Sequence, residues 1–302
     1  MADTPSTSSA ATSDAASSSR RYCSEHDRTE PLWGTADTVD VWLCLEYRPV
    51  WKARALTDNG LHVATRRWLD ETVAAFEARG LKARCQFVRQ PGSERAETRL
   101  LVTTAGRTRQ FSGVGYGFLE GLDLAAELDP ARGRQGGTIE PDGPLYLVCT
   151  NGQRDLCCAR FGLPVYAALR ERVGDRVWQV THLGGHRFAP NVLTLPDGCL
   201  YGRVSEASVD DFVARVEAGD VDFPHLRGRT CYSPAVQAAE AALARQGLRL
   251  LHVSDADGAT TVSFADAHER RSVTLVRSAT PRRVLKSCGD EVPEEVYPFV
   301  LA

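Results

Sequence analysis

The chain has 302 residues, of which 43% are hydrophobic and 25% are charged, and its formal net charge at pH 7 is −3. This length allows two or three compact domains with cores of their own, and the composition is that of a soluble globular protein. The charge excludes a protein that binds nucleic acid through a strong basic excess. No apolar run approaches the roughly 20 residues that span a bilayer, so we expect no membrane association.

The first 21 residues are rich in serine, alanine and threonine. They lack the apolar core of a secretory signal, so we expect residues 1–21 to be a disordered tail and the protein to be cytoplasmic. Nine cysteines is an odd number for a secreted disulfide framework. Reduced thiols in the cytoplasm, some of them serving a metal, are the better explanation.

Residues 22–137 predict an N-terminal α/β domain. A strand over Val39–Tyr47 is followed by a helix from about His62 to Arg79, whose apolar residues fall on one face. Strands are then expected at Lys82–Arg89, Thr98–Thr103 and Thr108–Val114, and a short helix over Phe118–Leu128.

Residues 138–222 begin within a linker at Arg132–Gly143 that is rich in Gly and Pro. After this linker, nearly the same order of elements is expected again. A strand, a helix that ends at Gly174 and a second strand are followed by a hairpin and a helix from about Ser208. The predicted strands are Leu145–Val148, Val177–Val180, Val192–Leu195 and Leu200–Val204. This is the order of a thioredoxin-like domain, and the two halves of this α/β protein could be divergent copies of one unit.

Residues 223–302 predict a small α+β cap. Ser233-Pro234 is a good helix start, with serine as the cap and proline in the first turn. The helix is expected to end at Gly247. Strands at Leu248–Val253, Thr260–Phe264 and Ser272–Val276 complete the region.

Two pairs of metal-binding side chains stand on predicted loops. Cys149 ends a buried strand, and Cys158 lies near the start of the next helix; His182 and His186 follow the strand Val177–Val180. Cysteine thiolate and neutral imidazole are side chains that hold iron–sulfur clusters and zinc. Because two such pairs coincide, the sequence predicts a metal centre made by Cys149, Cys158, His182 and His186.

The two glycines between the histidines argue against a helix there. Gly184 and Gly185 would each cost up to about 1 kcal/mol in a helix interior relative to alanine. In a loop they let the backbone approach a bulky cofactor and point amide groups at it. Pro164 allows two alternatives for the helix that follows Cys149. The helix begins near Cys157 and is kinked at the proline, or it begins close to Pro164 itself.

The remaining cysteines and histidines are interpreted as packed side chains, because a lone thiol or imidazole is more often buried than a ligand. This interpretation covers His26, His62, His225, His252, His268, Cys23, Cys44, Cys85, Cys199, Cys231 and Cys288. The adjacent pair Cys157-Cys158 could form a strained disulfide switch, although no Cys-x-x-Cys motif accompanies it.

The paired ligands belong to two longer segments, Cys149-Thr-Asn-Gly-Gln-Arg-Asp-Leu-Cys-Cys158 and His182-Leu-Gly-Gly-His186-Arg-Phe-Ala-Pro-Asn191-Val. Both segments resemble the sucrase/ferredoxin-like family. Cys23-Ser24, Pro31-Leu-Trp-Gly-Thr-Ala36, Trp42-Leu-Cys-Leu-Glu46 and Trp51 look like the amino-terminal half of that family. The resemblance runs from about Tyr22 through the hairpin after the His182 loop.

Members of this family are similar to thioredoxin-like ferredoxins and bind a [2Fe–2S] cluster through two cysteines and two histidines. The resemblance therefore implies that Cys149, Cys158, His182 and His186 bind the cluster, with Cys157 as the alternative to Cys158. The resemblance also implies that the protein is an electron carrier rather than an enzyme, and that its electron donor and acceptor are redox proteins. No convincing pair of carboxylates flanks a sugar site, so no sucrase or glycosidase activity is expected.

Histidine ligation has a consequence for the electron chemistry. Neutral imidazoles in place of two thiolates remove two negative charges from around the cluster. At an effective dielectric constant near 20, a unit charge at about 4 Å is worth about 4 kcal/mol. We therefore expect the reduction potential to rise by on the order of a hundred millivolts or more, the direction seen in Rieske centres.

Two other functions use the same residues. A structural zinc module would use the same four ligands, because two thiolates and two imidazoles also suit tetrahedral zinc. Such a protein would be colourless, whereas an iron–sulfur protein is red-brown. A thiol-based redox sensor would instead use Cys157-Cys158, and its disulfide exchange would continue without metal.

Overall fold

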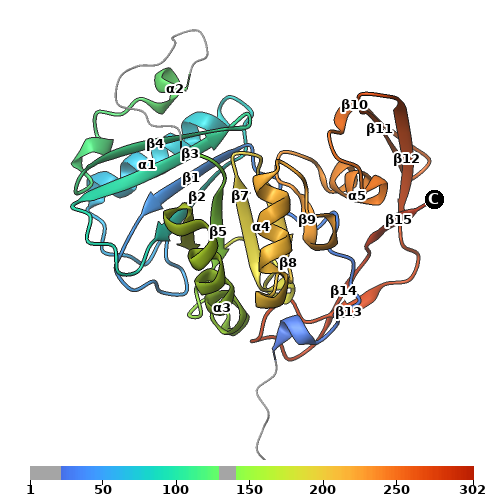
Figure 1. The fold of residues 1–302 in the computed structure, drawn as a ribbon, viewed down its shortest axis with the longest axis horizontal. Coiled ribbons are helices and arrows are strands. Elements are labelled where there is room, and N and C mark those ends of the chain that lie inside the picture. The colour runs from blue at the N-terminus through green and yellow to red at the C-terminus, as the bar shows by residue number, and fades with distance from the viewer. Residues whose placement is uncertain (1–21, 129–140) are drawn as a thin grey trace, which may run out of the picture.

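The computed structural model describes residues 22–128 and 141–302. The predicted tail over residues 1–21 lies outside them, as does most of the predicted linker at Arg132–Gly143. The described part is a mixed α/β protein built on a curled nine-stranded sheet with the strand order β4-β3-β1-β2-β6-β5-β7-β8-β9 (Figure 1). A separate four-stranded sheet has the order β10-β11-β12-β15.

The first half of the large sheet follows the predicted order of strand, helix and three strands. Strands β1 and β2 are parallel, whereas β3 and β4 join β1 as an antiparallel hairpin. The elements are β1 (Val41–Glu46), α1 (Val63–Glu77), β2 (Ala83–Arg89), β3 (Glu97–Thr104), β4 (Arg107–Val114) and α2 (Leu124–Glu127). Helix α2 is much shorter than the helix predicted over Phe118–Leu128, because a 3₁₀ turn at Gly117–Leu119 takes up its beginning.

The second half repeats this topology. Strands β5 and β6 are parallel, and β7 and β8 join β5 as an antiparallel hairpin. The elements are β5 (Leu145–Cys149), α3 (Leu156–Val173), β6 (Val177–Val180), β7 (Asn191–Leu195), β8 (Cys199–Gly202) and α4 (Val209–Glu217). The two halves meet where β2 pairs antiparallel with β6. The equal strand orders agree with the prediction that one unit occurs twice.

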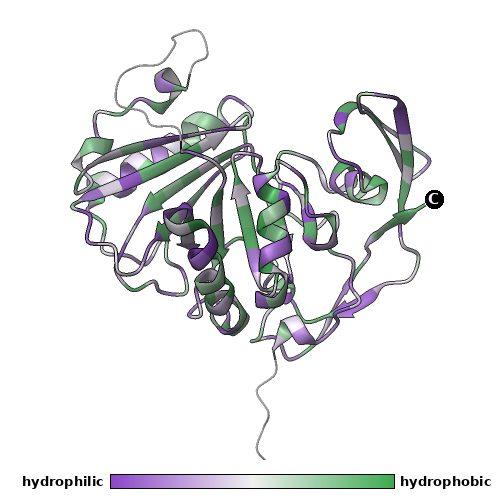
Figure 2. Ribbon diagram, viewed as in Figure 1, coloured by the Kyte–Doolittle hydropathy of each residue, from purple (hydrophilic) through white to green (hydrophobic). Residues whose placement is uncertain are grey.

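Apolar side chains on both faces hold the sheet together, and β5 and β7 are largely hydrophobic in Figure 2. On one face, α1 covers the first half and α3 and α4 cover the second. The opposite face carries one cluster with side chains from both halves, including Trp42, Leu147 and Trp178. Because neighbouring residues of a strand point to opposite faces, the all-buried strands β1 and β5 serve both faces at once.

The C-terminal region contributes to the large sheet as well as to its own. Strand β9 (Leu226–Arg229) pairs with β8 and ends the nine-stranded sheet. The other elements are α5 (Pro234–Leu243), β10 (Arg249–Ala256), β11 (Ala259–Ala265), β12 (Arg270–Arg277), β13 (Arg282–Val284), β14 (Glu294–Val296) and β15 (Phe299–Leu301). Strands β9, β13, β14 and β15 were not predicted. All are only three or four residues long, too short for a hydrophobic period to reveal.

The large sheet crosses both predicted domain boundaries, at residues 138 and 223, so the division into domains stays a prediction. In the described ranges 22–128 and 141–302, no helix has the length and hydropathy needed to cross a bilayer.

Candidate metal centre

The structure brings the two predicted pairs of ligands together. Cys149 is the last residue of β5, and Cys158 lies in the first turn of α3. Their Sγ atoms are 3.5 Å apart, and the Sγ of Cys158 is 3.2 Å from the Nδ1 of His186. The rings of His182 and His186 have centroids 4.8 Å apart. Two pairs of residues, Cys158 and His186 among them 28 positions apart, therefore converge at the carboxyl ends of two parallel strands.

Helix α3 takes the earlier of the two predicted starts, and Pro164 lies inside it. Asp155 caps the helix by accepting a hydrogen bond from the backbone amide of Cys157 at 2.9 Å. The helix then packs closely on β5, since a Cβ atom at Gly162 would lie 2.3 Å from the carbonyl oxygen of Cys149. The cap and this close approach position the thiol of Cys158 beside that of Cys149.

The histidines lie in a loop that three side chains hold by its backbone carbonyls. Gly184 and Gly185 have φ angles of 80° and 67°, in the left-handed region, so the segment between the histidines is not a helix. The side chain of Arg84 donates a hydrogen bond to the carbonyl oxygen of His182 at 3.2 Å. In the same way Arg227 donates to the carbonyl oxygen of Gly184 at 2.9 Å, and Asn191 donates to that of Gly185 at 3.0 Å. These bonds position the two imidazoles in advance of any ligand.

Arg227, in β9, is a residue that sequence reasoning missed. It is only 1% exposed, and its guanidinium group also donates to the side chains of Thr35 and Asn191. Burial lowers the pKa of Arg227 to about 9, which leaves it charged at neutral pH. A buried positive charge therefore lies against the imidazole loop.

The surroundings of Cys149, Cys158 and His186 shift the pKa values of these three groups. The hydrogen bond between Cys149 and Cys158, together with the neighbouring His182, lowers the pKa of Cys149 well below that of an ordinary thiol. The same hydrogen bond and burial raise the pKa of Cys158. Burial lowers the pKa of His186, which favours the neutral imidazole. The Nδ1 atom of His182 is buried without a hydrogen-bond partner, as expected of a nitrogen whose partner is a metal.

Residues from the first half of the chain pack against this centre on one side, and they line surface cavities that His182 also borders. Asn151 donates to the carbonyl oxygen of Lys52 at 3.0 Å, and Thr181 donates to Gln86 at 2.6 Å. His182 borders a surface cavity of about 240 Å³ and a wider hollow of about 1030 Å³ over α1 and β2. The thiols are at most 2% exposed. The imidazole of His182 is thus the part of the centre that reaches toward solvent.

Cys157 does not join this centre, because its side chain faces elsewhere. Successive residues of a helix point about 100° apart, so the adjacent thiols of Cys157 and Cys158 have different surroundings. The Sγ of Cys157 lies 3.5 Å from that of Cys23 and 3.2 Å from that of Cys288. Asp155 completes this second group of metal-binding side chains. All nine cysteines are free thiols, so Cys157 and Cys158 form no disulfide.

The thiols of the second group differ in their readiness to ionise. Hydrogen bonds from Cys23 and Ser24 outweigh burial and lower the pKa of Cys157 to about 6. Burial raises the pKa of Cys288 to about 12. Sequence reasoning had treated Cys23 and Cys288 as packed thiols. Their position near the two ends of the chain gave no signal that they would meet.

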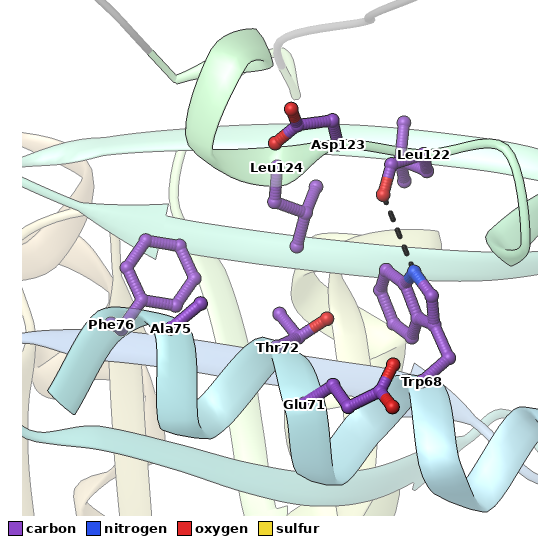
Figure 3. A pocket seen from close by; sticks show the side chains of 8 residues that line it. All are labelled: Trp68, Glu71, Thr72, Ala75, Phe76, Leu122, Asp123 and Leu124. Atoms are coloured by element: carbon purple, nitrogen blue, oxygen red, sulfur yellow. Dashed lines mark hydrogen bonds between the residues drawn. The ribbon is translucent and has the colours of Figure 1, made fainter. Parts of the chain in front are cut away.

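A further pocket lies between α1 and residues 122–124, at the start of α2, and shares no lining residue with either group (Figure 3). It has a volume of about 180 Å³, and Trp68 closes one end by donating a hydrogen bond to the carbonyl oxygen of Leu122. Its lining contains no cysteine or histidine.

Comparison with known proteins identifies the chain. A family model described as sucrase/ferredoxin-like matches residues 32–228. The chain belongs to the sucrase/ferredoxin-like family. The matched region contains all four residues of the predicted metal centre, as well as Arg84 and Arg227. No curated protein matches the chain.

Among solved structures, this sucrase/ferredoxin-like protein is similar over part of its length to a thioredoxin-like [2Fe–2S] ferredoxin from Aquifex aeolicus. The two are 20% identical over 28% of this chain and 91% of the ferredoxin, with a TM-score of 0.26. Two cysteine-to-serine variants of that ferredoxin match at 21% and 20% identity and a TM-score of 0.25, over 28% of this chain and 96% of theirs. A TM-score this low does not by itself establish a common fold.

Proposed function

We propose that this protein transfers single electrons through a [2Fe–2S] cluster held by Cys149, Cys158, His182 and His186. The observation that carries the proposal is the convergence of two buried thiols with two imidazoles, one of which has an unpartnered buried nitrogen. Thiolate and imidazole are the ligands of [2Fe–2S] centres of mixed type. Family membership supports the same conclusion.

The spread of the donor atoms favours two metal ions over one. Among the described residues, the second group, made of Cys23, Asp155, Cys157 and Cys288, has all its ligand atoms within 4.8 Å of one another. The four residues of the proposed centre are not so compact. A single zinc ion needs all its ligands at about 2.0–2.3 Å, whereas in a binuclear cluster only ligands of the same iron must be that close.

The residues of the chain adapt the centre to electron transfer. When bound, the cluster accepts and releases one electron at a time. Burial of Cys149 and Cys158 keeps water from the thiolates, and the positive charge of Arg227 favours the state that carries the extra electron. His182 borders the surface cavities, so we propose that redox partner proteins exchange electrons at this imidazole.

The fold supports the proposal in a coarser way. Strands β5 to β8 with α3 and α4 have the order expected of a thioredoxin-like ferredoxin domain, which we place at residues 138–222. The equivalent order in residues 22–137 suggests that the first domain is a second thioredoxin-like unit that provides a wall instead of ligands.

The test is anaerobic purification of the full chain, followed by iron and sulfide analysis and electron paramagnetic resonance. We expect a red-brown protein with equal iron and sulfide that becomes paramagnetic on one-electron reduction. Cys157→Ala should retain iron, because the side chain of Cys157 faces away from Cys149. A colourless protein with zinc in the four-residue centre would contradict the proposal, as would loss of all iron in Cys157→Ala alone.

A further inference from the structure

The second group of thiols joins parts of the chain that are far apart in sequence. Cys23 opens the 3₁₀ turn Cys23–Glu25, Asp155 and Cys157 stand at the start of α3, and Cys288 belongs to the C-terminal segment after β13. The ligand atoms of all four residues lie within 4.8 Å of one another. We propose that these residues hold one zinc ion in a closed tetrahedral site, separate from the four-residue centre.

The distances between the ligand atoms match the edges of a tetrahedron around one ion. With Zn–S near 2.3 Å and Zn–O near 2.0–2.2 Å, tetrahedral angles place sulfurs about 3.8 Å apart and a sulfur about 3.5 Å from the oxygen. The three sulfurs of Cys23, Cys157 and Cys288 are 3.5, 3.2 and 3.8 Å apart. The Oδ1 of Asp155 is 3.1 Å from Cys288 and 3.9 Å from Cys23. One ion therefore fits if the sulfurs of Cys157 and Cys288 move apart by about 0.6 Å and the other printed distances change by a few tenths of an ångström.

The same distances argue against other uses of the group. A four-iron cluster would need its cysteines further apart, because each would bind a different iron, and a [2Fe–2S] cluster would need two of its four ligands on a second iron, further from the other two. A disulfide would join two of the sulfurs and leave the third thiol and the carboxylate without a role. Three thiols and one carboxylate are instead a complete set of four zinc ligands. The three thiols would release their protons to solvent when the ion binds.

Hydrogen bonds around the group orient its ligands as they do in metal sites. The Oδ2 of Asp155 accepts from the hydroxyl of Ser287 and from the backbone amide of Cys288, both at 2.8 Å. Its Oδ1 accepts from the amide of Cys157 and has a lone pair left for an ion. The hydroxyl of Ser24 donates to the Sγ of Cys157 at 3.2 Å. These donors, with the positive end of α3, offset part of the ligands' negative charge.

The proposed ion would cross-link the two ends of the fold. In Figure 1 the first described turn and the β13–β14 hairpin lie side by side below the large sheet, and Arg282 pairs with Asp27 at 3.1 Å. An ion bound by Cys23 and Cys288 would fasten both segments to α3. Because Cys157 and Cys158 are neighbours, that link would also reinforce the start of α3, which the cap by Asp155 forms without an ion.

The experiment measures zinc and iron in the full chain produced with both metals and purified without chelators. We expect about one zinc per chain in addition to the iron. Cys288→Ser and Cys23→Ser should each lower the zinc content about tenfold or more while iron is retained. Cys149→Ala should lose iron but keep zinc. Cys231→Ser, which changes an exposed thiol outside both groups, should lose neither metal.

A second measurement does not depend on the folding of a variant. A zinc chelator added to the wild-type protein should lower its melting temperature and speed proteolysis after Arg277, and added zinc should reverse both. The inference would be overturned by wild-type protein that binds no zinc, by a Cys157–Cys288 disulfide in the unreduced protein, or by iron in place of zinc at these residues. Because zinc and iron are counted separately, this result is readable even if the proposed electron-transfer function fails.

Discussion

The two halves of the nine-stranded sheet have the same topology but different residues at equivalent places. Strand β5 ends at Cys149, whereas β1 ends at Glu46. The carboxylate of Glu46 is fully buried and pairs with Arg48 at 2.9 Å, and it accepts a hydrogen bond from the amide of Arg99. The end of a central strand thus holds the thiol of a proposed metal ligand in one half and a structural ion pair in the other.

This difference shows that the fold provides the position and the side chain decides the chemistry. Both strand ends are buried, which shields a ligand from water. The first half supplies no thiol or imidazole to the centre. It contributes instead through Arg84 and Gln86, which hold and line the loop of His182.

The largest expected effect contrasts the two strand ends directly. Cys149→Ala should lose all iron, because it removes one of four ligands. Glu46→Gln should keep its iron while the free energy of unfolding falls by about 1–3 kcal/mol, the usual cost of breaking a buried charged hydrogen bond. Iron analysis and urea unfolding check the pair. Iron retained in Cys149→Ala, or lost in Glu46→Gln, would erase the proposed difference between the halves.

Two glycines with nearly equal backbone angles sharpen the comparison. Gly185 in the imidazole loop has φ 67°, and Gly115 after β4 has φ 65°. A Cβ atom at Gly185 would lie 2.5 Å from Arg227, whereas at Gly115 nothing lies within 4 Å. Alanine at either position should cost about 1–2 kcal/mol for its conformation. Only Gly185→Ala should add about 1–3 kcal/mol for crowding and lose iron more readily. Equal losses in the free energy of unfolding for Gly185→Ala and Gly115→Ala would show that the imidazole loop can move away from Arg227.

Changing an imidazole to a thiolate should alter the electron chemistry without emptying the centre. His182→Cys should lower the reduction potential by on the order of a hundred millivolts or more, because it restores a negative charge. Redox titration followed by visible absorption measures the shift. His252→Cys, on the exposed strand β10, is the control and should leave the potential unchanged. An unchanged potential in His182→Cys would exclude His182 as a ligand.

The smallest expected effect is the dependence of the potential on pH. If both imidazoles bind the cluster, reduction would place negative charge beside them and favour protonation of their second ring nitrogens, so a proton would follow the electron. Between the pKa values of the oxidised and reduced states, the potential should fall by about 59 mV per pH unit for each proton taken up. Protein-film voltammetry between pH 6 and 10 would measure it. A flat line over this range would count against histidine ligation.

Local pattern was enough for much of the fold. The apolar run at Val177–Val180 predicted β6 with its observed bounds, and the helix predicted to end at Gly174 agrees with α3. Predictions from the sequence were wrong or missing where an element is only a few residues long. The segment after Phe118 forms a 3₁₀ turn and a brief helix, and the three- and four-residue strands at the C-terminal end depend on their partners.

The sequence by itself determined which paired thiols and paired imidazoles could serve as ligands of the proposed centre, because they can be recognised from residue type and spacing. Only the tertiary structure decided what their neighbours do. Cys157 and Cys158 are equivalent in the sequence, and the helical turn sends one toward Cys149 and the other toward Cys23. Arg227 and Cys288 come from strands and segments far along the chain. Contacts of this kind depend on how elements pack, which residue spacing does not encode.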